Sequence, residues 1–87
     1  MSIMKLHFDK NIKIKKHIEK VNIQIDFLNN DLYKIHAYYM EGTLLINVYT
    51  DVVRFPVVKG NGKKAFLDLR DKAIQIVENK IKEMYEE

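Results

Sequence analysis

The sequence contains no cysteine and no tryptophan, and it has one proline, three glycines and a single serine. Without cysteine, disulfide bonds and thiolate metal ligands are excluded. The only serine, Ser2, stands at the start of the chain, which argues against serine-nucleophile chemistry. No apolar run is long enough for a signal peptide or a membrane span. We therefore expect a cytoplasmic protein in a reducing compartment, with no membrane partner.

Groups that build active sites are also sparse. His7, His17 and His36 have no ligand-like spacing, and no two acidic residues are placed by spacing for acid–base catalysis. The sequence therefore predicts no catalytic residue, no metal site and no cofactor. We expect a protein that binds a partner rather than an enzyme.

Composition and charge define what kind of partner to expect. The 87 residues, 47% hydrophobic and 31% charged, are typical of a single globular domain over residues 1–87. The net charge is only +3, but six of the lysines lie in residues 1–20 and three more in residues 59–64. This concentration suits a polyanion or an acidic protein. The alternative is a lysine-rich surface that only contacts solvent.

The N-terminal basic segment, residues 1–20, has two interpretations. A strand from Ile12 to Val21 would point Ile12, Ile14 and Ile18 to one side. A short helix capped by Asp9 would instead group Ile14, Ile18 and Val21. We favour the extended form because isoleucine is β-branched.

Residues 21–58 predict an antiparallel meander. Apolar and polar residues alternate from Val21 to Phe27, as in a strand with one buried face. Turns are expected at 29–31, 41–42 and 50–51, with strands over 21–28, 32–40, 43–50 and 52–58. The last strand contains Pro56, which cannot donate a ladder hydrogen bond, so it should lie at an edge or bulge there.

Two predicted hairpins give the meander a register. Pairing Leu28 with Leu32 places Ile25 opposite Ile35 and Asp26 opposite Lys34. Pairing Met40 with Thr43 places Tyr39 opposite Leu44, Ala37 opposite Ile46 and Ile35 opposite Val48. Both hairpins then direct the same residues inward. The predicted inner face comprises Val21, Ile23, Ile25, Phe27, Ile35, Ala37, Tyr39, Leu44, Ile46 and Val48.

The last third of the chain predicts one long amphipathic helix over residues 63–86. Its apolar stripe comprises Phe66, Leu69, Ala73, Ile76, Val77, Ile81 and Met84. A start near Lys63 brings Arg70 into this stripe, whereas a start after Asp68 avoids that conflict, and we favour the earlier start. The fold class is α+β: an antiparallel meander of four or five strands with a C-terminal helix packed on one face.

A basic glycine loop leads into this helix. Free backbone N–H groups, the positive helix end and nearby ammonium groups can together hold a phosphate. The candidate nucleic-acid or anion-binding residues are Lys59, Gly60, Gly62, Lys63 and Lys64, extended by Lys13, Lys15 and Lys16. The alternative is a flexible turn with solvated lysines.

The outer face of the predicted sheet is the second candidate site. It combines aromatic and polar side chains: Lys34, His36, Tyr38, Leu45, Asn47 and Tyr49. Such a face can stack bases, as single-strand binders do. It can equally form half of a homodimer interface, or be an ordinary solvated face.

The first functional hypothesis is a small nucleic-acid-binding protein that forms a homodimer. The alternative is a protein-interaction module or inhibitor that binds an acidic or nucleic-acid-handling protein. Small size and lysine and asparagine richness suit a phage or mobile-element accessory protein of that second kind.

Overall fold

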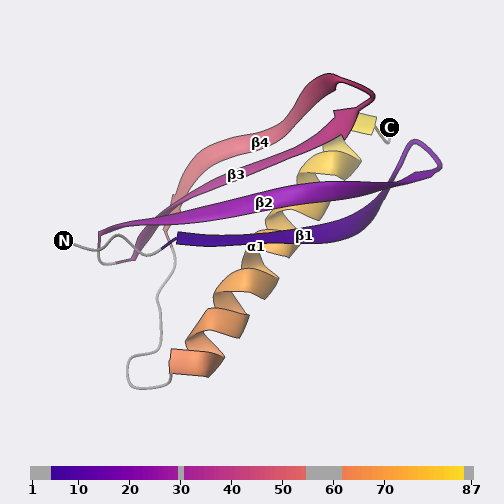
Figure 1. Cartoon of the computed structure of the whole chain (residues 1–87). Coiled ribbons are helices and arrows are strands. Elements are labelled where there is room, and N and C mark those ends of the chain that lie inside the picture. The colour runs from indigo at the N-terminus through magenta and orange to yellow at the C-terminus, as the bar shows by residue number, and fades with distance from the viewer. Residues whose placement is uncertain (1–4, 30, 55–61, 86–87) are drawn as a thin grey trace.

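The computed structural model describes residues 5–29, 31–54 and 62–85. The described elements are β1 (Lys5–Ile14), β2 (His17–Asn29), β3 (Leu32–Glu41), β4 (Leu44–Arg54) and α1 (Gly62–Tyr85). The strands form one antiparallel sheet in the order β1-β2-β3-β4, and α1 crosses one face of it (Figure 1). The predicted α+β meander with a C-terminal helix is therefore confirmed.

Residues 5–20 are extended, but they contain a hairpin that the sequence did not reveal. Ile14 pairs with His17, so Lys15 and Lys16 alone form the turn. Their φ angles are 51° and 72°, the two positive values that a type I′ turn requires. The turn places Ile18 opposite Lys13, away from the core, and 66% of Ile18 is exposed. The expectation that Ile18 shares a face with Ile12 and Ile14 was wrong.

The β2–β3 register follows the sequence-based prediction over most of its length. Ile25 pairs with Ile35, and Asp26 pairs with Lys34. The exception lies beside the turn, where Leu32 pairs with Asn29 rather than Leu28 and the ladder shifts register. Hydrophobic alternation and an opposite-charge pair were sufficient to fix this hairpin.

The predicted β3–β4 register was wrong. The turn is Gly42–Thr43, because Gly42 supplies the positive φ of 65° at its first position. Tyr39 therefore pairs with Ile46, and a register shift follows between Ala37 and Tyr38, where β4 contains one extra residue. Beyond it, Ala37 pairs with Tyr49.

Strand β4 is continuous from Leu44 to Arg54, so the predicted break at residues 50–51 does not occur. The predicted strand over 52–58 was wrong as a separate element, since residues 52–54 belong to β4. Its remainder, including Pro56, lies outside the described residues. Thr43 likewise belongs to the turn, and Leu44, predicted to point inward, is 62% exposed at the start of the strand.

Helix α1 begins at Gly62, as the earlier of the two predicted starts requires. The residues of α1 buried in the core recur every four positions: Leu69, Ala73, Val77 and Ile81. Arg70 does not enter the core, because its guanidinium lies over the ring of Phe8, 5.3 Å from the centroid. Met84 is 41% exposed, and the side chain of Phe66 lies outside the described part of the structure.

The core lies between α1 and the inner face of the sheet. Side chains from all four strands contribute to it: Ile12, Ile14, Val21, Ile23, Ile25, Tyr33, Ile35, Ala37, Tyr39 and Val48. Among the described elements, α1 alone covers a face of the sheet, and the opposite face is open (Figure 1). The helix that the structure describes lacks the length of apolar sequence needed to cross a membrane.

Candidate functional site

The open face of the sheet is built by residues that alternate with the core residues along each strand. Strand pairing aligns them in three neighbouring rows across the sheet. The rows are Lys5–Asp26–Lys34–Val52, His7–Gln24–His36–Thr50 and Asp9–Asn22–Tyr38–Asn47. A patch of polar and aromatic side chains thus occupies the middle of an uncovered sheet face, and we call it the open-face patch.

Two rings lie together in this patch. His36 and Tyr38 are two residues apart on β3 and therefore point to the same side. Their ring centroids are 5.2 Å apart and the ring planes are tilted by 36°. This is the spacing of a favourable aromatic pair. Both residues are partly exposed, so the pair offers ring surface to a ligand.

The orientation of His36 is set by one hydrogen bond to Asn47 of β4, and Thr50 in turn positions Asn47. Its Nε2 lies 3.0 Å from Oδ1 of Asn47, and Oγ1 of Thr50 donates to the same oxygen at 3.1 Å. A carbonyl oxygen only accepts, so Nε2–H of His36 is the donor in this hydrogen bond. The histidine ring is therefore positioned before any ligand arrives.

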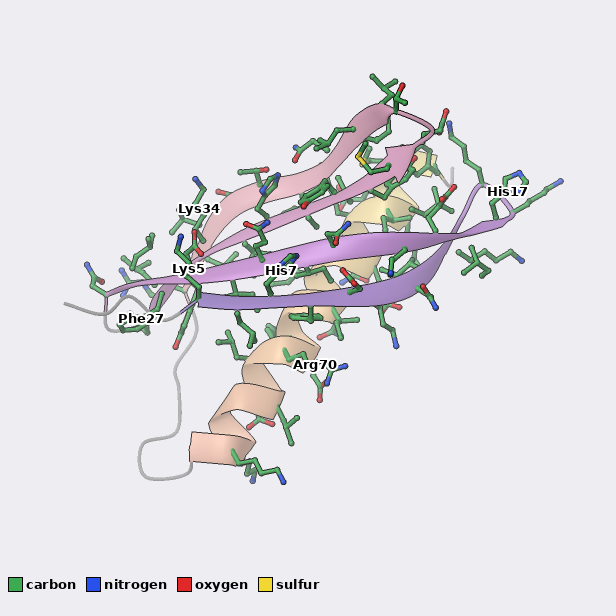
Figure 2. The ribbon with its side chains drawn as sticks, viewed as in Figure 1. Lys5, His7, His17, Phe27, Lys34 and Arg70 are labelled. Atoms are coloured by element: carbon green, nitrogen blue, oxygen red, sulfur yellow. The ribbon has the colours of Figure 1, made fainter. Side chains whose placement is uncertain are left out.

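Charged groups lie in the cross-strand row beside His36. Lys5 and Lys34 stand on either side of Asp26 in the same cross-strand row, and His7 lies in the next row (Figure 2). Both lysines are exposed. At the corner of the sheet, Nη1 of Arg54 donates to Oδ1 of Asp31 at 2.6 Å. The open-face patch thus has two lysines at the His36 end of the ring pair, and Asp26 and Asp9 balance their formal charge.

The structure places only some of the predicted outer-face residues on the open face. Lys34, His36, Tyr38 and Asn47 do share the open face, whereas Tyr49 does not. The extra residue in β4 reverses the alternation, so Tyr49 lies opposite Ala37 and packs against the core. Leu45 lies on the open face at the end of the β3–β4 hairpin, where it pairs with Met40, and the two are 51% and 46% exposed.

A cavity lies between the β1–β2 hairpin and α1. It has a volume of about 540 Å³ and separates the tip of the hairpin from the last turns of α1. We call it the hairpin-tip cavity. Lys13, Lys15 and Lys16, predicted as anion contacts, line it together with Lys82 of the helix. Nζ of Lys15 lies 4.7 Å from the ring centroid of Tyr85.

The predicted basic site is divided in space. Lys63 and Lys64 are exposed in the first turn of α1, while the hairpin-tip cavity contacts α1 from Glu78 onward. At 1.5 Å per residue, Lys64 and Glu78 are about 21 Å apart along the helix. The two lysine groups therefore cannot contact one small anion together. Lys59 and Gly60 lie outside the described residues, and Gly62 is the first residue of α1.

The tyrosine side chains on the helix side of the sheet contribute to packing. The hydroxyls of Tyr39 and Tyr85 are 3.3 Å apart. This hydrogen bond, with burial, raises the pKa of Tyr39 far above its usual value. Burial also raises the pKa of Tyr33 and of Tyr49. In residues 5–29, 31–54 and 62–85, no three histidine or acidic side chains are grouped as a metal site.

Sequence reasoning missed several residues of both features. Lys5 and His7 belong to the open-face patch, and their alternation with Leu6 and Phe8 was the available signal. Lys82 and Tyr85 border the hairpin-tip cavity, but no local pattern links them to residues 13–16. That contact depends on where the helix crosses the sheet.

Comparisons with protein-family models, with curated proteins and with solved structures each found no match for this chain. Any function must therefore be inferred from the geometry of the chain itself.

Proposed function

We propose that this protein binds single-stranded nucleic acid on the open-face patch, without catalysing a reaction. The observation that carries the proposal is the ring pair of His36 and Tyr38, held 5.2 Å apart on an uncovered sheet face. Aromatic rings on such a face stack with bases, and each stacked base contributes about 1–3 kcal/mol.

The polar neighbours of the rings suit the other parts of a nucleotide. Lys5 and Lys34 flank the rings from one end and would contact phosphates. Gln24 lies beside His36 in the same row and offers both a donor and an acceptor to a base edge. Duplex nucleic acid is a poor fit, because its stacked bases are not available to rings on a sheet.

Mild charge sets the expected strength of binding. The whole chain has a net charge of +3, so only a few phosphates would be neutralised. We therefore expect moderate affinity that falls with salt, with a slope smaller than that of strongly basic proteins. Lys63 and Lys64 are exposed in the first turn of α1 and would contact longer strands.

Fluorescence anisotropy with a labelled single-stranded oligonucleotide tests the proposal at low and at physiological ionic strength. DNA and RNA of the same sequence are compared. Tyr38→Thr keeps a residue of high strand propensity in β3 but removes the ring, and it should weaken binding about 5- to 100-fold. Tyr38→Phe keeps the ring and should bind like the wild type. No binding to either strand at low salt, or equal binding by both variants, would refute the proposal.

A second candidate function is protein binding, including self-association, through the end of the β3–β4 hairpin. Met40 and Leu45 form an exposed apolar pair there, and Leu44 is 62% exposed beside them. Apolar side chains of this size are typical anchors of protein interfaces. Sedimentation of the wild type and of Leu45→Lys tests it: a homodimer that the substitution dissociates supports this function, and a monomer in both argues against self-association.

A further inference from the structure

We propose that the hairpin-tip cavity binds a small amphiphilic anion, a compact acidic group carried on an apolar body. This site is separate from the open-face patch and does not depend on nucleic-acid binding. The cavity opens between the β1–β2 hairpin and the C-terminal end of α1, and its volume of about 540 Å³ is that of a small-molecule site.

The apolar part of the site is provided by isoleucines. Ile12 and Ile14 of β1 and Ile81 of α1 line the cavity, and all three belong to the core cluster. They are 7%, 2% and 5% exposed, so their side chains are held in place by the surrounding packing. The cavity thus has a rigid apolar floor of small exposed area, which suits a small apolar group better than a fully hydrated ion.

The charged part of the site is provided by lysines from both sides. Lys13, Lys15 and Lys16 come from the hairpin and Lys82 from the helix. The acidic lining residue is Glu78, so the lining has a net charge of +3. Helix α1 also ends here, and its exposed carbonyls oppose an anion with about half a negative charge. Four ammonium groups outweigh both effects, and an acidic ligand is therefore preferred to a cation.

The backbone of the turn that contains two of these lysines also supports the proposal. Lys15 and Lys16 have positive φ angles, a conformation that asparagine and glycine adopt far more easily than lysine. Lysine at both positions makes the hairpin less stable than the sequence Asn-Gly would make it. The two charges therefore weaken the fold locally while they enclose the cavity, as expected if they serve a ligand.

The ring of Tyr85 also contributes to the site. Lys15 lies over Tyr85, whose hydroxyl is held by Tyr39 at 3.3 Å. This contact fixes the helix end and keeps one ammonium group at the edge of the cavity before a ligand binds. The site is thus partly preorganised, which lowers the entropic cost of binding.

Titration with anilinonaphthalene sulfonate, a fluorescent sulfonate on an apolar ring system, tests the proposal on the full chain at neutral pH. The matched probe is N-phenylnaphthylamine, which has the same rings without the sulfonate. We expect saturable binding of one sulfonate probe per chain and weaker binding of the neutral probe. Competition with decanoate and with decyl phosphate distinguishes a carboxylate from a phosphate ligand.

Variants assign the binding to the cavity. The double substitution Lys15→Asn with Lys16→Gly suits the turn, so the protein should remain folded while its affinity for the sulfonate probe falls about tenfold or more. Lys82→Gln removes a charge from the opposite wall and should weaken binding in the same direction. Lys10→Gln with Lys72→Gln removes two exposed lysines that do not line the cavity and should leave the affinity within about twofold.

Two results would overturn the proposal. One is unchanged affinity for the sulfonate probe in both cavity variants. The other is equal affinity for the neutral and the anionic probe, which would show an apolar surface without anion selectivity. Neither result bears on oligonucleotide binding by the open-face patch, so the two proposals can fail separately.

Discussion

Nζ of Lys15 lies 4.7 Å from the ring centroid of Tyr85, and this contact joins the tip of the β1–β2 hairpin to the last turn of α1. The two residues are 70 positions apart in the chain. Lys15 is the first residue of a turn with two positive φ angles, so the ammonium reaches the ring from a backbone conformation unfavourable to lysine. Hairpin stability and helix docking are therefore coupled at this point.

Replacing Lys15 with Asn and Lys16 with Gly should stabilise the fold. Non-glycine residues with positive φ cost about 1–2 kcal/mol each, while the lost cation–π contact is worth about 0.5–1 kcal/mol. The net gain expected in the free energy of unfolding is about 1–3 kcal/mol, measured by denaturant titration. Lys15→Ala with Lys16→Ala removes the same charges without relieving the turn, and it should not stabilise. A less stable Asn-Gly variant would contradict the assigned turn.

Ile14→Ala and Ile18→Ala should differ strongly in stability. Ile14 is 2% exposed and its truncation should cost about 2–5 kcal/mol, because it leaves a cavity in the core. Ile18 is 66% exposed and its truncation should change stability by less than about 0.5 kcal/mol. Thermal or chemical unfolding of the two variants measures the difference. Similar losses of stability in the two variants would mean that both isoleucines are buried, which contradicts the assigned turn at Lys15 and Lys16.

High pH should destabilise the protein through Tyr39. Its pKa is raised in the folded state, first by the hydrogen bond with Tyr85 and then by burial. The neutral hydroxyl therefore contributes stability that is fully present below pH 10, the usual value, and is lost as pH rises toward the folded-state pKa. Unfolding titrations across this range should show the decline.

Tyr85→Phe provides the control for that pH effect. It removes the hydroxyl partner and should lower the pKa of Tyr39 toward its usual value, which ultraviolet absorbance of tyrosinate detects. The variant should also lose about 0.5–1.5 kcal/mol of stability at neutral pH. An unchanged tyrosinate titration would show that the two hydroxyls do not interact.

Local sequence patterns predicted the parts of the fold that depend on alternation. Ile25 with Ile35 and Asp26 with Lys34 pair as expected, because apolar spacing and opposite charges agree on one register. The long helix and its start were also predictable from three- and four-residue spacing. These features are encoded over a few consecutive residues.

The features that were missed depend on backbone conformations that cannot be predicted from the residue types at those positions. Lys15 and Lys16 are not turn-forming residues, yet tertiary packing of Ile12 and Ile14 against α1 holds them with positive φ. The extra residue in β4 leaves no sequence signal either, and it moves Tyr49 from the predicted outer face to the core. The candidate site changed accordingly: the ring pair of His36 and Tyr38 remained, and the predicted third ring was lost.

Amide chemical-shift mapping with a short single-stranded oligonucleotide tests the proposed function most directly. We expect the shifts to be concentrated on the open-face patch, at Lys5, His7, Lys34, His36 and Tyr38. Amides of the hairpin-tip cavity and of the buried face of α1 should move little. Shifts confined to the start of α1, or no shifts at low salt, would contradict the assignment of the open face as the nucleic-acid site.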